Sequence, residues 1–474
     1  MIKKIHGGTT ETDIVKMVEK AETLASINMT KYGIDTVLFF DEANTSDALG
    51  LIKEVMCDRR INGRQIVNNV KFIAACNPYR KHTNLMINKL ESAGLGFFVK
   101  ASETQQKLGK IPLRQLVYRV LDLPPSMRPL VYDFGQLNFN TEKDYIFQIV
   151  KNRCLYIPQV TEKSDVIQAV TDILVWSQNH MREKNDECSF VSLRDVERAM
   201  IVFSYFCQKK DIFINKVAEK AEKEQKHPVD DITRSLILAV SVCFHARLTN
   251  RAVFEEGVAK QFKAPLTLAG RDQFCNEIRW CQDILLDNMK LGENIARNAA
   301  LRENIFMMVI CIELRIPLFL VGKPGSSKSL AKSIVSTSML GRASEKELMK
   351  EMKAVQMFSY QCSQLSTPES VIEVFEVAKS FQTEEQDVGS YVSVVVLDEV
   401  GLAEDSPNLP LKALHPLLED GTEGADSSLQ IVSREQRVAF IGISNWALDP
   451  AKMNRGVMVT RGDPDETELE LSAR

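Results

Sequence analysis

The sequence contains the stretch Ile316-Pro317-Leu318-Phe319-Leu320-Val321-Gly322-Lys323-Pro324-Gly325-Ser326-Ser327-Lys328-Ser329-Leu330-Ala331-Lys332. Its apolar run, glycine-bearing loop and Lys-Ser pair at the start of a helical pattern predict a strand, a phosphate-binding loop and a helix. In such a loop, successive backbone N–H groups and the positive end of the helix dipole point at one anion. We therefore expect the residues from Gly322 to Leu330 to bind a nucleotide, with Lys328 on its outer phosphates and the Ser329 hydroxyl on Mg²⁺.

One position of this loop departs from the usual pattern, G-x-x-x-x-G-K-S/T. Gly322, Lys328 and Ser329 match the pattern, but Ser327 stands where the second glycine belongs. A side chain is tolerated there only if the local φ is negative or if the loop accepts some strain. The conformation of Ser327 therefore bears on whether this is a nucleotide loop or a Gly/Ser turn.

A second stretch, from Val392 to Glu399, is rich in β-branched residues and ends in two carboxylates. It predicts a strand buried on both faces of a parallel sheet, with Asp398 and Glu399 at the carboxyl edge, where open α/β sheets bind ligands. Asp398 would hold Mg²⁺ through water, and Glu399 would polarise the attacking water. A third apolar run ends in Asn445, which we expect between the acidic strand and the phosphate loop, in contact with water or the γ-phosphate. Together these motifs predict a site that binds and hydrolyses ATP.

The acidic strand and the amide strand are repeated near the start of the chain. Residues 36–43 form an apolar run ending in Asp41 and Glu42, and residues 70–77 form another ending in Asn77. Asp41 thus corresponds to the Mg²⁺ carboxylate, Glu42 to the water-polarising glutamate and Asn77 to the terminal amide. Between them, Asn62-Gly63 predicts a hairpin turn.

This first copy has no phosphate loop. Only a helical pattern over residues 10–26 precedes Asp41, and the short run Gly7-Gly8-Thr9-Thr10 lacks the lysine. Either the copy is degenerate or the chain begins inside it. Because the sequence also stops soon after the third motif, we expect an internal part of a longer protein.

The residues between the two copies have helical apolar spacing. The expected helices are 113–121, 142–151, 165–180, 192–209, 230–248 and 270–289. Ser192 and Asp195 have the spacing of a capping box, which places Arg194 in the first turn of its helix. A helix dipole does not favour a cation there, so Arg194 is either placed for an anion such as a γ-phosphate or is a solvated surface residue.

The composition of the 474 residues, with 45% hydrophobic and 26% charged, is ordinary for a globular protein. The net charge of −4 gives no basic footprint, so we predict no nucleic-acid partner. No apolar run approaches the about 18 residues of a spanning helix, so no transmembrane segment is expected. None of the ten cysteines is in a C-x-x-C pair, which favours reduced thiols in the cytosol.

These motifs in this order resemble tandem AAA+ ATPase modules. Three further runs, 113–120, 131–137 and 444–450, are similar to the mysterin family, giant RING-type ubiquitin ligases with a dynein-like ring of AAA+ modules. The resemblance implies an α/β fold of tandem P-loop NTPase modules, each a parallel sheet with flanking helices, joined by an all-helical lid or linker. The implied domains are 1–140, the later part of a first core; 141–300, the lid and connecting helices; and 301–474, the earlier part of a second core.

The resemblance also assigns roles to individual residues. Lys328 and Ser329 would be Walker A residues, Asp398 and Glu399 the Walker B pair, and Asn445 the first sensor. Asp41, Glu42 and Asn77 would have the corresponding roles in the first module, with Arg194 as its second sensor. An arginine of the following module completes each site in such rings, and either Arg455 or Arg461 would reach the first module in this way.

Three functions remain open at this point. The first is an ATPase that binds ATP, releases ADP and drives movement between neighbouring modules of the same longer chain. Ligase activity, contact with the ubiquitination machinery and its substrates, and lipid-droplet association are implied by the resemblance alone. The second is a nucleotide-binding scaffold without turnover, which Ser327 favours and the Asp398-Glu399 pair opposes. The third is a dynein-like or midasin-like motor without ligase activity.

Overall fold

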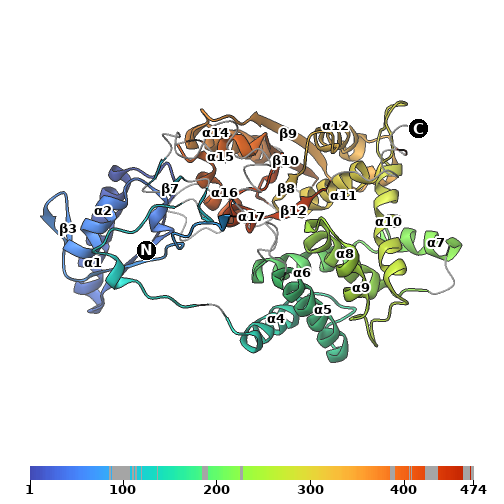
Figure 1. The fold of residues 1–474 in the computed structure, drawn as a ribbon, viewed down its shortest axis with the longest axis horizontal. Helices are drawn as coiled ribbons and strands as arrows, with labels where there is room; N and C mark the ends of the chain where they lie inside the picture. Colours follow the sequence, from blue (N-terminus) through green and yellow to red (C-terminus); the bar gives the residue numbers. More distant parts are fainter. Residues whose placement is uncertain are drawn as a thin grey trace.

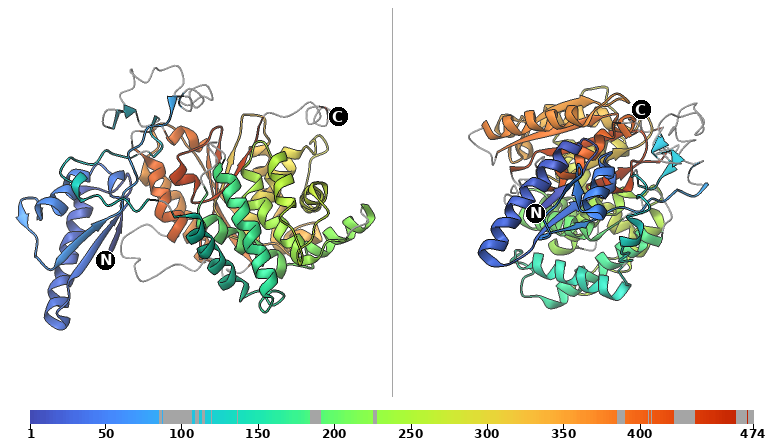
Figure 2. Two further views of the ribbon diagram at one scale, coloured as in Figure 1. Left: turned by 60° about the horizontal axis from the view of Figure 1, so that its bottom comes forward. Right: turned by 90° about the vertical axis from the view of Figure 1, so that its left-hand side faces the viewer.

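The computed structural model describes residues 1–84, 87, 107–108, 111–112, 115–118, 120–135, 137–183, 191–224, 228–384, 390–404, 406, 408–421, 436–462 and 470. In these residues the chain forms two units that each contain a parallel sheet, which we call the first and the second unit, and a helical region between them in sequence. Figures 1 and 2 show the first unit at one end of the molecule and the helical region beside the second unit.

The first unit contains a three-stranded parallel sheet in the order β1-β2-β5. Its strands and helices are β1 (Ile2–Lys4), α1 (Glu11–Tyr32), β2 (Thr36–Asp41), α2 (Leu49–Lys53) and β5 (Val70–Ala74). Helix α1 begins where Thr10 and Asp13 form a capping box and ends at Gly33, whose φ of 64° suits a residue without Cβ. The apolar face of α1 packs on the sheet and forms a separate hydrophobic core. The short strand β1 was not expected from the sequence.

The predicted hairpin of the first unit is confirmed. Strands β3 (Arg60–Ile61) and β4 (Arg64–Gln65) pair antiparallel. Asn62 and Gly63 between them have φ values of 49° and 78°, as the tight hairpin turns favoured by this dipeptide require.

The second unit contains a five-stranded parallel sheet in the order β12-β8-β11-β10-β9. Its strands are β8 (Leu318–Val321), β9 (Ala354–Gln361), β10 (Tyr391–Asp398), β11 (Ala439–Ser444) and β12 (Val457–Thr460). Its helices are α11 (Ala299–Glu313), α12 (Lys328–Ser338), α13 (Glu347–Lys350), α14 (Pro368–Glu384), α15 (Val400–Glu404), α16 (Leu414–Asp420) and α17 (Pro450–Met453). Strand β11 lies between β10 and β8, so the strand that precedes Asn445 lies where we expected it.

The sheet of the second unit is buried on both faces, as the β-branched run of β10 predicted. Val394 and Val396 belong to the core that includes α11 and α12, whereas Val395 and Leu397 belong to the core that includes α14 and α16. Alternate residues of one strand therefore fill two cores.

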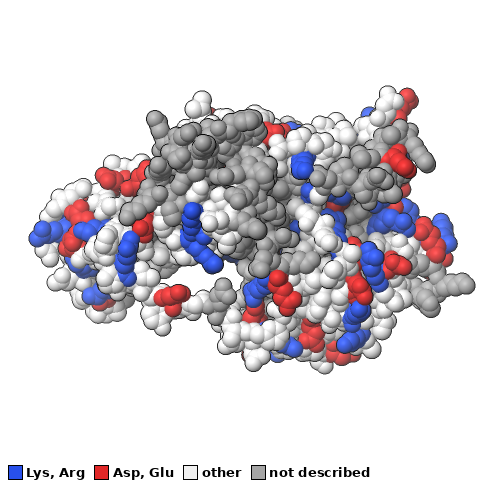
Figure 3. All heavy atoms as spheres, in the orientation of Figure 1, with Lys and Arg blue, Asp and Glu red and all other residues white. Residues whose placement is uncertain are grey.

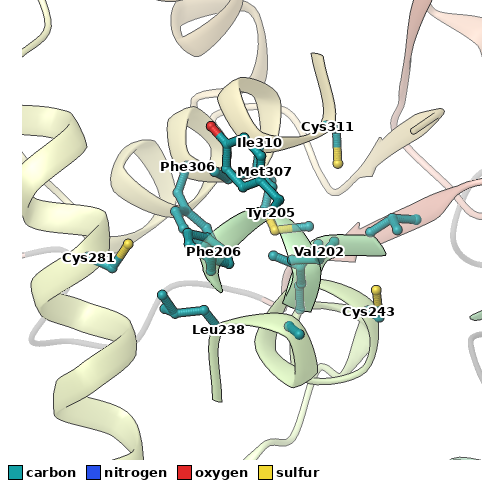
Figure 4. Packing of buried hydrophobic residues seen from close by; sticks show 14 of the residues in the cluster. Val202, Tyr205, Phe206, Leu238, Cys243, Cys281, Phe306, Met307, Ile310 and Cys311 are labelled. Carbon is teal, nitrogen blue, oxygen red and sulfur yellow. The ribbon is translucent and has the colours of Figure 1, made fainter. Parts of the chain in front are cut away.

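The helical region consists of α4 (Phe139–Cys154), α5 (Ser164–Glu183), α6 (Leu193–Gln208), α7 (Ile214–Glu224), α8 (Asp231–Cys243), the single turn η5 (His245–Arg247), α9 (Ala252–Ala259) and α10 (Arg271–Asp287). Its core is continuous with one core of the second unit. Figure 4 shows this packing, with side chains of α6, α8 and α10 against Phe306, Met307 and Ile310 of α11. The helical region and the second unit therefore form one packed body.

The helix expected over residues 113–121 is wrong where the structure describes that stretch. Leu116 forms an antiparallel bridge with Lys81, and the Val117 N–H donates to the Arg80 carbonyl at 2.8 Å. Backbone groups that a helix would use internally are thus taken by tertiary pairing with residues 80–82, and local apolar spacing does not reveal this.

Charges intermingle on the molecular surface. On the face shown in Figure 3, Lys and Arg side chains lie among Asp and Glu side chains over the described helices. Among the described residues, no helix is both long enough and apolar enough to cross a membrane.

Candidate functional site

The phosphate-loop stretch forms the predicted strand, loop and helix. Strand β8 ends at Val321 and α12 begins at Lys328, whose side chain is buried. The Lys328 ammonium donates to the carbonyls of Gly322 at 2.5 Å and Lys323 at 3.0 Å. Burial lowers the pKa of Lys328, and the nearby carboxylates of Glu399 and Asp398 oppose that shift. The cation therefore lies beneath its own loop and faces both acids.

Ser327 adopts the left-handed conformation, with a φ of 58°. Of the two ways in which a side chain fits at this position, the loop therefore takes the strained one. For a residue with a Cβ this conformation costs roughly 1–2 kcal/mol. The loop thus keeps the backbone shape of a glycine without having the glycine.

Replacing Ser327 by glycine is expected to raise the denaturant midpoint of the chain, with a gain of about 1 kcal/mol, because glycine adopts this φ without strain. Ser333→Gly is the matched control. Ser333 is exposed in α12, the helix that follows Ser327, and glycine there should destabilise the chain by about 0.5–1 kcal/mol. Loss of stability in Ser327→Gly would contradict the strained conformation.

The acidic pair and the amide meet at the carboxyl edge of the sheet. Asp398 accepts from the Lys332 ammonium at 3.1 Å. Glu399, with a φ of 52°, turns away from the strand and accepts from the Asn445 side-chain amide at 3.0 Å. The structure thus brings the expected residues of β10 and β11 into contact, beside the loop that holds Lys328.

Two further residues lie near this loop: Asn304, which no motif indicated, and the candidate Arg461. Asn304 of α11, only 1% exposed, donates to the Ser326 carbonyl at 2.9 Å and so supports the loop from below. Arg461 lies at the end of β12 and pairs with Glu303 at 2.5 Å. The sequence carries little signal for Asn304, because it directly follows Arg302 and Glu303 at the polar start of α11.

The first unit repeats the turn at the acidic pair. Glu42 follows β2 with a φ of 57°, close to that of Glu399. Burial, and then the charge of Glu42, raise the pKa of Asp41. The Asn77 backbone is held by the Asn44 side chain, which donates to the Asn77 carbonyl at 2.8 Å. In the described part of the chain, the Asn77 side chain makes no hydrogen bond to Glu42, unlike Asn445 with Glu399.

Residues of the second unit hold Glu42 instead. An Arg455 Nη2 lies 2.5 Å from Glu42 Oε1, and His415 Nδ1 is hydrogen-bonded to Glu42 Oε2. Burial would raise the pKa of Glu42, but His415 and Arg455 outweigh it and hold the pKa well below its usual range. Of the two candidate arginines, the structure therefore places Arg455 beside the first unit, whereas Arg461 pairs within the second.

A second carboxylate, Glu419 of α16, joins all three parts of the molecule. It pairs with Arg194 of α6 at 2.8 Å, with Lys4 of β1 at 3.2 Å and with Arg455 at 3.2 Å. Arg194 is half exposed and takes part in this interface through its ion pair with Glu419.

His415 makes this interface sensitive to acid. Burial, and then the charge of Arg455, lower the pKa of His415 to about 4, so the ring is neutral at neutral pH and donates from Nδ1. Glu42, Arg455 and Lys412 are the charged groups that act on it. An unfolded histidine takes up its proton near pH 6.5, so this group stabilises the fold above that pH and loses the contribution as the pH falls toward 4.

Lowering the pH from 7 to 5 is therefore expected to cost about 2 kcal/mol of stability through His415. His415→Gln keeps an N–H donor and removes the titration, so its stability should fall less over the same range. Thermal unfolding at both pH values compares the two chains. An equal fall in both would contradict a neutral, buried imidazole.

The residues present fit Mg²⁺ and a nucleotide. Mg²⁺ is usually held by one or two carboxylates together with substrate phosphates. Asp398 and Ser329 at the second site, and Asp41 at the first, would supply the protein ligands. Among the described residues, no group of three or more His, Cys, Asp or Glu side chains could hold a metal by itself.

Comparison with known proteins agrees with this arrangement. Two family models, both described as RNF213 AAA domain, match residues 1–80 and 294–468, together more than half of the chain. The chain is 52% identical over 472 residues to the E3 ubiquitin-protein ligase rnf213-beta of Danio rerio, and 50% identical to E3 ubiquitin-protein ligase RNF213 of Mus musculus and of Homo sapiens. In each comparison 99% of this chain is aligned, but it spans only 9% of the relative's length. This chain therefore belongs to the RNF213, or mysterin, family and corresponds to part of its AAA-domain region.

Proposed function

We propose that this chain comprises the later part of one AAA+ module and the earlier part of the next, in an ATPase that binds ATP with Mg²⁺ and hydrolyses it to drive movement between modules. The proposed division is 1–140 for the later part of the first core, 141–300 for the lid and connecting helices, and 301–474 for the earlier part of the second core. One observation carries the proposal: Lys328, Asp398, Glu399 and Asn445 converge at the carboxyl edge of one parallel sheet, with Glu399 hydrogen-bonded to Asn445.

At the second site each residue has a defined role. Bound Mg²⁺–ATP supplies the phosphoanhydride bond that water cleaves. Lys328 would exchange its bonds to the loop carbonyls for phosphate oxygens, while the N–H groups at the start of α12, which have no partners within the helix, would face the same phosphates. Glu399 would accept hydrogen bonds from the attacking water, and Asn445 would keep the Glu399 carboxylate in place.

At the first site the proposal uses residues of both units. Asp41 and Glu42 would act as the Walker B pair, with Asn77 and Arg194 as sensors. Arg455 would reach the first site from the second module, because it pairs with Glu42 and Arg461 does not. A guanidinium at this position stabilises charge that develops on the phosphoryl group.

The relatives suggest a setting for this activity. They are named E3 ubiquitin-protein ligases. We propose that ATP-driven movement of these modules serves a ubiquitin ligase, whose ubiquitination machinery and substrates would be engaged by other parts of a longer protein. A scaffold without turnover is the second candidate, and the strained Ser327 favours it.

Two substitutions separate these functions. Lys328→Ala should remove nucleotide binding, whereas Glu399→Gln should keep binding and remove turnover. A parent chain that binds ATP and releases no phosphate would support the scaffold and overturn the ATPase.

A further inference from the structure

Helix α6 carries a buried charged cluster around Asp195, the residue that follows Arg194. Asp195 is fully buried and accepts three hydrogen bonds: from the Ser192 N–H at 2.9 Å, from Arg198 at 2.9 Å and from Arg247 of η5 at 2.8 Å. The predicted capping acid is thus present, but it also fixes two guanidinium groups. The Ser192 hydroxyl makes no hydrogen bond within the described residues.

The remaining donors of Arg198 reach the second unit. Its Nη2 donates to the Asn454 carbonyl at 2.8 Å, and its Nη1 donates to the Gly456 carbonyl at 3.3 Å. These carbonyls belong to the residues on either side of Arg455. Figure 1 shows α6 next to α17 and β12, the two elements that this short segment joins.

A planar guanidinium is suited to this contact, because its N–H groups have fixed relative directions. Bonding to both carbonyls restrains the backbone before and after Arg455, and so restrains the direction in which the Arg455 side chain leaves. Gly456 adds to the restraint, because a Cβ there would lie 2.6 Å from the Pro317 carbonyl oxygen. Residues 454–456, which we call the Arg455 segment, are therefore held between α6 on one side and the start of β8 on the other.

Helix α6 also reaches Arg455 by a second route. Arg194 and Arg198 are four residues apart, so they lie on one face of the helix. Arg194 pairs with Glu419, which in turn pairs with Arg455 Nε. One helix thus contacts the backbone beside Arg455 directly and its side chain through a shared carboxylate.

We propose that Arg198 is a positioning residue that sets Arg455 against Glu42 of the first unit. The inference rests on the proposed function, in which Arg455 completes the first site. A movement of α6 would then be transmitted to Arg455 through the two hydrogen bonds that Arg198 donates to the neighbouring carbonyls. If Arg198 only connected the helical region to the second unit, its loss would not change what the Arg455 side chain contacts.

The two roles can be separated by the imidazole of His415, which lies beside Glu42 and responds to the Arg455 charge. In the chain labelled with ¹⁵N-histidine, nuclear magnetic resonance follows the titration of this ring. Arg455→Gln should move its midpoint upward by about one pH unit, since a neighbouring cation is lost. Arg198→Gln should move the midpoint in the same direction, and the double variant should move it no further than Arg455→Gln alone.

A matched control is the residue that precedes Arg198 in the same helix. Glu197 pairs with Arg153 on the surface, at 2.7 Å, so Glu197→Gln removes an ion pair of α6 without contacting the Arg455 segment. It should leave the midpoint unchanged. Arg198→Lys keeps a charge for Asp195 but lacks the planar fork, and it should shift the midpoint upward even if Arg198→Gln fails to fold.

An unshifted midpoint in both folded Arg198 variants, with a shift in Arg455→Gln, would overturn the positioning role. An unshifted midpoint in Arg455→Gln would overturn the contact itself. Neither of these two conclusions depends on whether the chain hydrolyses ATP. A chain that shows the expected shifts and hydrolyses no ATP would support the positioning role and refute the proposed ATPase, so the two failures are distinguishable.

Discussion

Replacement of Lys328 by alanine is expected to weaken ATP binding by about 100-fold or more. Hydrogen bonds to charged groups contribute about 1.5–3 kcal/mol each, and this ammonium would contact two phosphates. Its present partners, the carbonyls of Gly322 and Lys323, show that the cation lies within the loop rather than in solvent. Equilibrium binding of radiolabelled ATP to the parent and variant chains measures the effect.

Lys350→Ala is the matched control for this substitution. Lys350 belongs to the same unit, but it pairs on the surface with Glu347 at 2.6 Å, so its removal should leave the affinity unchanged. Chelation of Mg²⁺ should weaken binding to the parent chain. If ATP bound Lys328→Ala as tightly as the parent, the assignment of the loop would be wrong.

The sequence predicted the core of the second unit well because its strands are buried on both faces. A continuous run of β-branched residues is typical of a strand buried in a parallel sheet, so the pattern predicts both β10 and the acidic residues at its end. Strand β11 follows in the same way, and the order of loop, acids and amide then fixes which strands must be neighbours. The resemblance to a known family was confirmed over nearly the whole chain.

The remaining features depend on contacts between residues far apart in sequence. Arg455 and Arg461 are equivalent in the sequence, and only their ion pairs, with Glu42 of the first unit and with Glu303 respectively, distinguish them. His415 and Arg198 belong to no motif, because their partners are a glutamate and two backbone carbonyls in other units. The φ of Ser327 was also left open, because the residue types of a loop do not by themselves decide whether it takes a strained form.

Replacement of Glu399 by glutamine is expected to lower the rate of ATP hydrolysis by about 10²–10⁴-fold, the usual contribution of a positioned acid or base. ATP affinity should remain close to that of the parent chain, because Glu399 contacts water and not the phosphates in the proposed site. Phosphate release under saturating ATP, measured beside equilibrium binding, separates the two quantities.

The substitution is informative because it preserves the geometry around residue 399. Glutamine has nearly the same shape, and its carbonyl oxygen can still accept the bond from Asn445 that the carboxylate accepts at 3.0 Å. A fall in turnover therefore reports the lost negative charge and not a displaced side chain. Glu376→Gln on the exposed surface of α14 makes the same chemical change away from the site and should leave turnover unchanged. Turnover that survives in Glu399→Gln would contradict the proposed role of Glu399 in polarising the attacking water.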